Sequence, residues 1–562
     1  MNTPNIITRR SFLDRSVKLG ALGALAALTD IPFVVKRALA EGNIGGNGKK
    51  LLFIWLRGGN DVLSSIIPVQ DPAYNASNRP TTVIPKDGLT DYSVGNIPCD
   101  FPVNSNAAAA TFSYNSAIRL GNGFAALHPS LKFLAPVYNA GDLAVIHRVG
   151  YPRQSRSHFD SQNYWENGAP NNNFEKEGIF YRTMLEAIQQ NTAKSTGLTG
   201  VTLQTALPLI LRGSRAAMTN LTDPLRYDLL GIPNTSTNAN AKAFGAVTNA
   251  APFAFPDKLN RQLLSLQYAN MTSTLQIFAA IDFTENGNTF LDDTALDGES
   301  APYHLFPTTS AKNGGYAMHG NDTNKYVVPS NSAALFSNLK AAALILNRTD
   351  AIVAGTEFGG FDTHSAQGGA TGAHANLQRQ VAWALYSLRK FFRIYGKGGA
   401  QEMAGAQIGW NDLVIVTLSE FGRTTIENNS TGTDHAEGGG MLVAGGAVKG
   451  YGKPGATTGV FGCHTSDSVP WVNGPAGAAP ANATGSMFGI SNRYLKRAYD
   501  YRSVLGRIIR QHLGATQTQL NRIIPGYANE SQEHLLSGGT VASPIESGST
   551  TTAIMGEPDL LV

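Results

Sequence analysis

The chain has 562 residues, of which 42% are hydrophobic and 15% charged, and its formal net charge at pH 7 is +4. This composition allows a large buried core, and the length permits more than one domain. Charged residues are fewer than the roughly 25% usual in soluble proteins, which indicates a surface of Asn, Ser, Thr and Gly, as in many exported proteins.

The net charge comes from the first 40 residues. Residues 1–40 contain six basic and two acidic side chains, which account for all of the +4. The rest of the chain is therefore close to neutral. A neutral chain has no basic surface for nucleic acid or for an anionic membrane, so neither partner is expected.

The N-terminal segment resembles a twin-arginine export signal. Arg9 and Arg10 are followed by Phe12, then by an apolar stretch at 19–28 and an Ala-Leu-Ala cleavage site at 38–40. We expect residues 1–40 to be recognised by the twin-arginine translocase and removed, leaving a periplasmic or secreted protein. The alternative is an amphipathic helix of the fold. A bilayer requires about 20 apolar residues, so the mature chain is expected to contain no membrane-spanning segment.

Four apolar runs predict strands that are buried on both faces, as in a parallel sheet. They are residues 50–56, 143–149, 351–356 and 413–418. Helical periodicity predicts helices between and after these strands. They are residues 130–138, 178–190, 257–281, 332–346, 376–395 and 501–513.

Strands that alternate with helices predict an α/β fold with a doubly wound, mostly parallel sheet. We expect a single domain over residues 41–525, with long loop insertions near 71–124, 285–330 and 450–490. Ser, Gly and Thr dominate residues 526–562, which predicts a flexible C-terminal tail. Cys99 and Cys463 could form a disulfide in an oxidising compartment or stay free, and their spacing does not decide between the two.

Polar clusters follow the predicted strands, where ligands of parallel sheets usually bind. They are Asp61; Arg156, Ser157 and His158; Asp362 and His364; and Glu420, Arg423, Asp434 and His435. Oxygen and imidazole ligands together suit Zn, Mn or Fe, and additional carboxylates suit Mg or Ca. We therefore expect a site for a divalent metal or an anion.

Some of these residues also have a structural interpretation. Asp61 follows a strand and could cap a helix, and His364 could bond the backbone of its own loop. The glycines around Asp434 and His435 allow close approach of the backbone. They favour a ligand or catalytic role for that pair.

The chain resembles the domain of unknown function 1501 family of exported bacterial proteins. The matching motifs are LRGGND (56–61), SRSHFDSQNYWENG (155–168), DTH (362–364), TLSEFGRT (417–424), GTDH (432–435) and DYRSVLGRIIRQHLG (500–514). That family is in turn similar to a distant branch of the alkaline phosphatase and sulfatase superfamily. The resemblance implies an alkaline phosphatase-like fold.

The resemblance also implies roles for individual residues. The metal ligands would be Asp61, Asp362, His364, Glu420 and His435, with Asp434 beside them. Ser157 would be the nucleophile at a helix N-terminus, with His158 beside it, and Arg156 or Arg423 would bind the anion. Phe421 follows Glu420 where the superfamily has a second ligand, so one imidazole of that pattern is absent.

The expected function is an exported, metal-dependent hydrolase of phosphate or sulfate esters, with a small ester or a glycan-type molecule as substrate. The alternative is a non-catalytic envelope protein that uses the same scaffold for binding or assembly. A metal-dependent oxidoreductase is less favoured, because the chain has no haem, flavin or iron–sulfur motif. A formylglycine sulfatase is not expected either, because the chain lacks the C-x-P-S-R and C-x-A-x-R motifs.

Overall fold

The computed structural model describes most of the chain beyond the N-terminal segment. The described residues are 42–85, 117–190, 198–222, 281–283, 290–292, 304–307, 333–455, 458–469, 471, 494–527, 535–542 and 551–562. The predicted export signal, the predicted helix at 257–281 except its last residue, Cys99 and most of the insertion at 285–330 lie outside these residues. Cys463 is described and buried.

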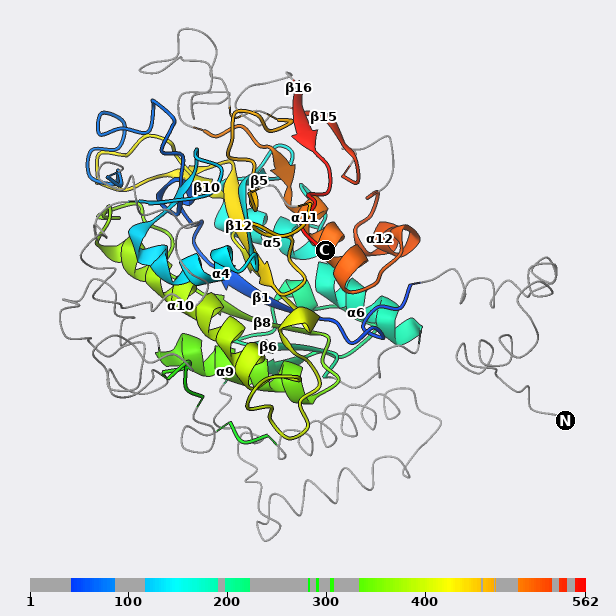
Figure 1. Ribbon diagram of the computed structural model, residues 1–562. Helices are drawn as coiled ribbons and strands as arrows, with labels where there is room; N and C mark the ends of the chain where they lie inside the picture. Colours follow the sequence, from blue (N-terminus) through cyan, green and yellow to red (C-terminus); the bar gives the residue numbers. More distant parts are fainter. Residues whose placement is uncertain are drawn as a thin grey trace, which may run out of the picture.

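A large mixed sheet forms the centre of the molecule, and most of its strands are parallel (Figure 1). In spatial order its strands are β15 (Gly538–Ala542), β16 (Thr551–Met555), β14 (Tyr499–Asp500), β5 (Leu143–Gly150), β12 (Gly439–Gly445), β9 (Leu413–Leu418), β1 (Lys50–Leu56), β8 (Val353–Phe358), β6 (Gly200–Leu203) and β7 (Thr219–Leu221), with β13 (Val460–Phe461) beside β5. Strand β12 runs antiparallel to both of its neighbours, and β15 runs antiparallel to β16. The predicted mostly parallel α/β sheet is confirmed.

Strand β1 shows why the sheet is covered on both faces. It is apolar at successive positions, and all seven of its residues are buried. Successive side chains of a strand point to opposite faces. Leu52, Ile54 and Leu56 accordingly join one hydrophobic core. Leu51, Phe53 and Trp55 join the other.

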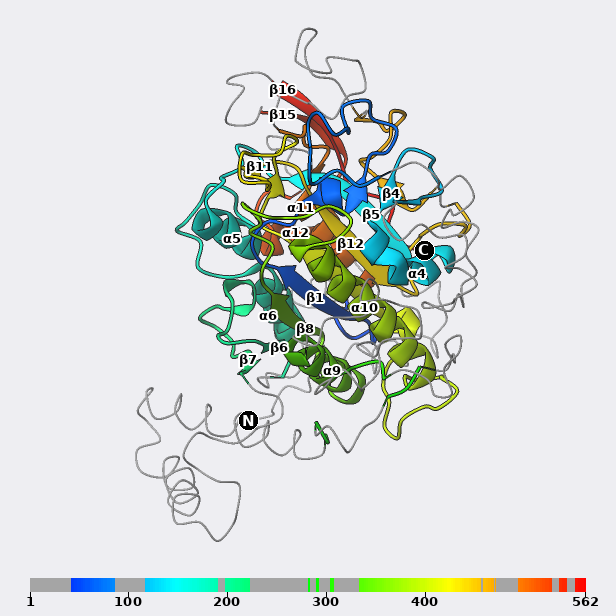
Figure 2. The ribbon, with the colours of Figure 1, turned by 90° about the vertical axis from the view of Figure 1, so that its left-hand side faces the viewer.

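Helices cover the two faces of the sheet (Figures 1 and 2). On one side lie α4 (Ala135–Asn139), α9 (Ala333–Arg348) and α10 (Ala373–Ile394). On the other lie α5 (His158–Asn167), α6 (Ile179–Gln189), α11 (Tyr501–Arg507) and α12 (Gln517–Ile523). Among the described residues, no helix combines the length and the apolar character that a membrane span requires.

Two parts of the sheet differ from the sequence-based expectation. The segment after His435 was not among the predicted strands, but Gly439–Gly445 forms β12 in the middle of the sheet. The expected flexible tail instead contributes β15 and β16, and Leu560 and Leu561 are buried. The described part of residues 526–562 therefore extends the sheet. Its Ser, Gly and Thr residues lack the apolar pattern by which strands are predicted from a sequence.

The topology brings one end of several strands together. Strands β1, β8 and β9 are parallel, and β5 points the same way because β12 is antiparallel to both β5 and β9. The carboxyl ends of these four strands therefore lie at the same edge of the sheet. The loops that follow them hold most of the polar clusters predicted from the sequence.

Candidate metal centre

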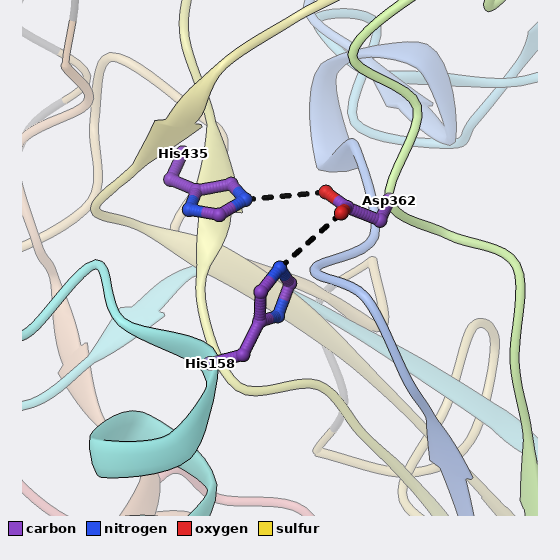
Figure 3. Close-up of side chains that lie close together, drawn as sticks. All are labelled: His158, Asp362 and His435. Atoms are coloured by element: carbon purple, nitrogen blue, oxygen red, sulfur yellow. Dashed lines mark hydrogen bonds and ion pairs between the residues drawn. The ribbon is translucent and has the colours of Figure 1, made fainter.

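Three side chains from different loops meet at this edge of the sheet. His158 begins α5, Asp362 lies on the loop after β8, and His435 begins β11 (His435–Ala436). Each offers one atom that could bind a metal, and the three atoms lie within 4.8 Å of one another. Figure 3 shows both imidazoles directed toward the Asp362 carboxylate. The distances are 3.1 Å from His435 Nε2 to Asp362 Oδ1 and 3.4 Å from His158 Nε2 to Asp362 Oδ2.

His364 borders the same group of atoms. Its Nε2 lies 2.8 Å from His435 Nε2 and 3.2 Å from Asp362 Oδ1. Its Nδ1 lies 3.1 Å from Asp434 Oδ1, which also accepts a hydrogen bond from Asn428. Asp434 thus contacts the outer nitrogen of His364 and orients this ring.

The backbone holds His435 in place. Its Nδ1 lies 2.7 Å from the carbonyl oxygen of Arg156. A carbonyl only accepts hydrogen bonds, so Nδ1 must carry the hydrogen. In the neutral ring, Nε2 then has a free lone pair directed at Asp362 and His364. Burial lowers the pKa of His435, which favours this neutral form.

Glu420 contacts the Nδ1 side of the His158 ring and holds it in place. The Glu420 side chain is fully buried, and its Oε1 lies 2.9 Å from His158 Nδ1. The hydrogen bond that His158 donates to Glu420, with the charges of Glu420 and Asp362, raises the pKa of His158 against the opposing effect of burial. Ser157 caps the helix just before His158 and accepts a hydrogen bond from the backbone of Asp160.

Asp362 stays ionised because of a buried arginine. Burial acts to raise its pKa, but the hydrogen bond and charge of Arg423, together with His435 and His364, hold the pKa at about 2. Arg423 is fully buried, and its guanidinium also donates to the carbonyl oxygens of Gly58, Gly59, Phe361 and Thr433. These bonds occupy Nε, Nη1 and Nη2, so Arg423 ties three loops together instead of presenting a free cation to a substrate.

An aromatic ring forms the apolar side of the site. Phe421 is fully buried, and its ring centroid lies 4.8 Å from that of His158 and 4.4 Å from that of His435. The backbone of Gly59 approaches this ring so closely that a Cβ there would overlap it, and Gly59 has a φ of +78°. The two glycines of the 56–61 motif thus serve packing at the site, since a Cβ at Gly58 would overlap the backbone of Asp362.

The polar atoms of Asp61, Glu420 and Arg156 bond other protein groups and are not placed to bind a metal or an anion. Asp61 is fully buried, caps a 3-10 helix at Val62–Ser64, and accepts hydrogen bonds from Arg79, Ser64 and Gln367. Burial acts to raise its pKa, and Arg79 and the neighbouring donors hold it at about 2. Both oxygens of Glu420 are likewise occupied by protein donors. The guanidinium of Arg156 donates to the hydroxyl of Tyr494 at 2.6 Å.

The spacing of His158 and the polar residues that follow it could have shown which way this side chain faces. His158 was expected to be a catalytic residue beside Ser157 and not a metal ligand, but it joins Asp362 and His435 in the group that could hold a metal. His158, Ser161 and Gln162 have the spacing of one helix face, and Ser161 and Gln162 both bond Glu420. That spacing indicates a helix docked on the loop after β9.

The comparisons identify one family. Residues 48–469 match the family described as "Protein of unknown function (DUF1501)", which is more than half of the chain. The chain therefore belongs to this family. The comparison with curated proteins found no match, and the comparison with solved structures found none either.

Proposed function

We propose that this member of the DUF1501 family is a metal-dependent hydrolase of phosphate or sulfate esters. The observation that supports this proposal most is the arrangement of three imidazoles around one carboxylate. The Nε2 atoms of His158, His364 and His435 all lie within 3.4 Å of an oxygen of Asp362. If the Nδ1 atoms carry the hydrogens of neutral rings, the Nε2 lone pairs face this carboxylate, and a bound cation would stabilise the arrangement.

The outer side of each ring supports the same interpretation. The Nδ1 atoms of the three histidines contact Glu420, Asp434 and the carbonyl oxygen of Arg156, respectively. Metal-binding histidines almost always donate their second nitrogen to a carboxylate or a carbonyl, which fixes the ring and its tautomer. All three rings of this site have such a partner.

The chemistry of the donors favours a transition metal. Nitrogen and carboxylate ligands together suit zinc, and also manganese or iron, whereas magnesium and calcium prefer oxygen ligands. The site is also open on one side, because the side chains of Asp362 and His364 are 46% and 43% exposed. Catalytic zinc sites keep an open position for substrate, whereas structural sites are closed by protein ligands.

A divalent metal here would polarise the ester oxygen and lower the pKa of a bound water. The chain would supply the rest of the site. Arg423 keeps Asp362 ionised, Phe421 excludes water from the apolar side, and the Nδ1 partners hold the rings. Ser157 is the proposed nucleophile because its hydroxyl lies at the start of α5, next to His158, where a helix N-terminus favours an anion.

The proposal includes export and a distant fold relationship. Residues 1–40 would direct the folded protein through the twin-arginine translocase to the periplasm or the medium. The position of the site at the carboxyl ends of parallel strands supports a relationship with the alkaline phosphatase and sulfatase superfamily.

The test is an ester panel on metal-loaded protein purified from its native host. We expect hydrolysis of at least one phosphate or sulfate ester, and its loss in His435→Ala. The matched control is His464→Ala, since His464 bonds Ser466 on a different loop. A metal-free protein that is inactive on the whole panel would contradict the proposal and would favour a binding or assembly role.

Ser157→Ala tests the nucleophile within the same assay. If Ser157 attacks the ester, activity falls by several orders of magnitude, up to the roughly 10⁶-fold that loss of a nucleophilic serine can cost. Retained activity would instead indicate direct attack by water.

A further inference from the structure

We infer that Glu420 is a positioning residue that fixes the tautomer of His158, an inference that rests on the proposed metal centre. Glu420 lies at the end of β9 and its side chain is 0% exposed. The family resemblance implied that Glu420 is a metal ligand. The contacts of its carboxylate give it a different role.

Every described contact of this carboxylate is with a hydrogen-bond donor or with His158. Oε1 accepts from the backbone N–H of Gly58 at 2.8 Å and from Gln162 Nε2 at 3.0 Å. Oε2 accepts from Trp55 Nε1 at 3.3 Å. The N–H groups of Gly58 and Trp55 can only donate, so both oxygens act as acceptors.

This arrangement decides where the hydrogen of His158 lies. Since Glu420 Oε1 is an acceptor, His158 Nδ1 must donate to it across their 2.9 Å separation. In the neutral ring Nε2 then has no hydrogen. This nitrogen is buried and has no hydrogen-bond partner among the described residues, and it faces Asp362 Oδ2 at 3.4 Å. In the neutral ring this buried lone pair faces a carboxylate, and a cation between the two would satisfy both.

Glu420 also ties the position of α5 to the site. Its backbone carbonyl accepts hydrogen bonds from Ser161 and from Gln154. The side chain of Glu420 therefore sets the orientation of the His158 ring, and its backbone fixes the start of the helix that carries the ring. His364 and His435 have their own acceptors, so Glu420 acts on the metal through His158 alone.

The test is a double-mutant cycle on zinc affinity, measured by competition with a chromophoric chelator. Glu420→Gln keeps the size of the side chain and removes its charge. We expect it to weaken zinc binding by about 10–100-fold, as is typical for partners of metal ligands. In the His158→Ala background, the same substitution should change affinity by less than about twofold, because coupled residues are not additive.

The control is Glu427→Gln, on the loop that follows. Glu427 accepts hydrogen bonds from Thr81 and Thr82, so its loss perturbs a neighbouring loop without touching a histidine. We expect no change in zinc affinity. An equal loss from Glu420→Gln in both backgrounds would overturn the inference and leave the metal centre intact. Absence of zinc binding in the unmodified protein would overturn both.

A measurement on the unmodified protein covers the case in which Glu420→Gln does not fold. In metal-free protein labelled with ¹⁵N-histidine, the His158 resonances are identified by their loss in His158→Ala. A hydrogen on Nδ1 is expected. A neutral ring with its hydrogen on Nε2 would contradict the assignment.

Discussion

Arg423 shows how a single residue can determine the shape of the site. It forms an ion pair with Asp362 and donates four hydrogen bonds to backbone carbonyls of three loops. The planar guanidinium presents five donors in a fixed fork, which suits this role better than a lysine would.

Replacing Arg423 should therefore destabilise the whole fold. For Arg423→Met we expect a loss of about 3–5 kcal/mol in the free energy of unfolding, because the substitution leaves Asp362 and several carbonyls without their partner. Denaturant titration measures this loss. The control is Arg393→Met on the exposed side of α10, which should change stability by less than about 0.5 kcal/mol. Equal effects of the two substitutions would contradict the role of Arg423.

Gly59 allows a second residue-level prediction with a closely matched control. Gly59→Ala should cost about 1–3 kcal/mol of folding stability and weaken metal binding, because a Cβ would push Phe421 against two of the histidines. Gly48 has a similar φ of +75°, but a Cβ there would meet nothing within 4 Å. Gly48→Ala therefore isolates the backbone cost of positive φ. If both variants lose the same stability and keep full metal affinity, the contact with Phe421 is unimportant.

The residue types of the site were predictable, but their partners were not. Asp362, His364 and His435 were predicted as ligands because Asp and His cluster after apolar strands. Asp61 and Glu420 look the same in sequence, and they differ because Arg79, Trp55 and Gln162 occupy their oxygens. Residues 61 and 79, or 55 and 420, meet only after folding, so spacing along the chain does not reveal the pairs.

At the scale of elements, strands with apolar side chains were easier to predict than strands built on glycine. The runs that form β1 and β9 are buried at every position, so hydrophobicity alone defines them. Strand β12 begins and ends with glycine, and a Cβ at Gly445 would overlap the backbone of Leu413. Its glycines allow close packing in the middle of the sheet, and they also make the segment resemble a loop.

The C-terminal segment should contribute to stability if it is part of the fold. Leu560 is fully buried in the core that contains α11 and α12, whereas Val562 is 78% exposed. We expect Leu560→Ala to lower the free energy of unfolding by about 2–5 kcal/mol, as for other buried leucines. Val562→Ala, two residues away, should have little effect. Similar small effects of both substitutions would instead support a flexible tail.

The molecule as a whole contains several histidines that are buried in the neutral form. Burial lowers the pKa of His128 and of His147 to about 3, and that of His512 to about 4. One ring nitrogen of each lies within hydrogen-bond distance of a backbone carbonyl, those of Gly369, Ile66 and Lys50, respectively. These contacts are made by the neutral ring.

These pKa shifts predict loss of stability in mild acid. The folded-state pKa values lie below the unfolded value of about 6.5, so the contribution is fully present above that pH and is lost as pH falls toward the folded values. Each histidine can remove about 1.4 kcal/mol per pH unit over that range. Denaturant unfolding between about pH 7.5 and about pH 4.5 should show this decline. His512→Gln, which keeps a donor for Lys50, should lessen it, and a flat profile would contradict the prediction.

The central claim is that the histidines at the edge of the sheet hold one divalent metal ion. Metal content and X-ray absorption of protein purified from its native host test this claim directly. We predict one transition-metal ion per chain, with scattering from several imidazoles, and loss of the metal in the double variant Asp362→Ala, His435→Ala. A protein without transition metal, or one whose metal content is unchanged by that double substitution, would contradict the account.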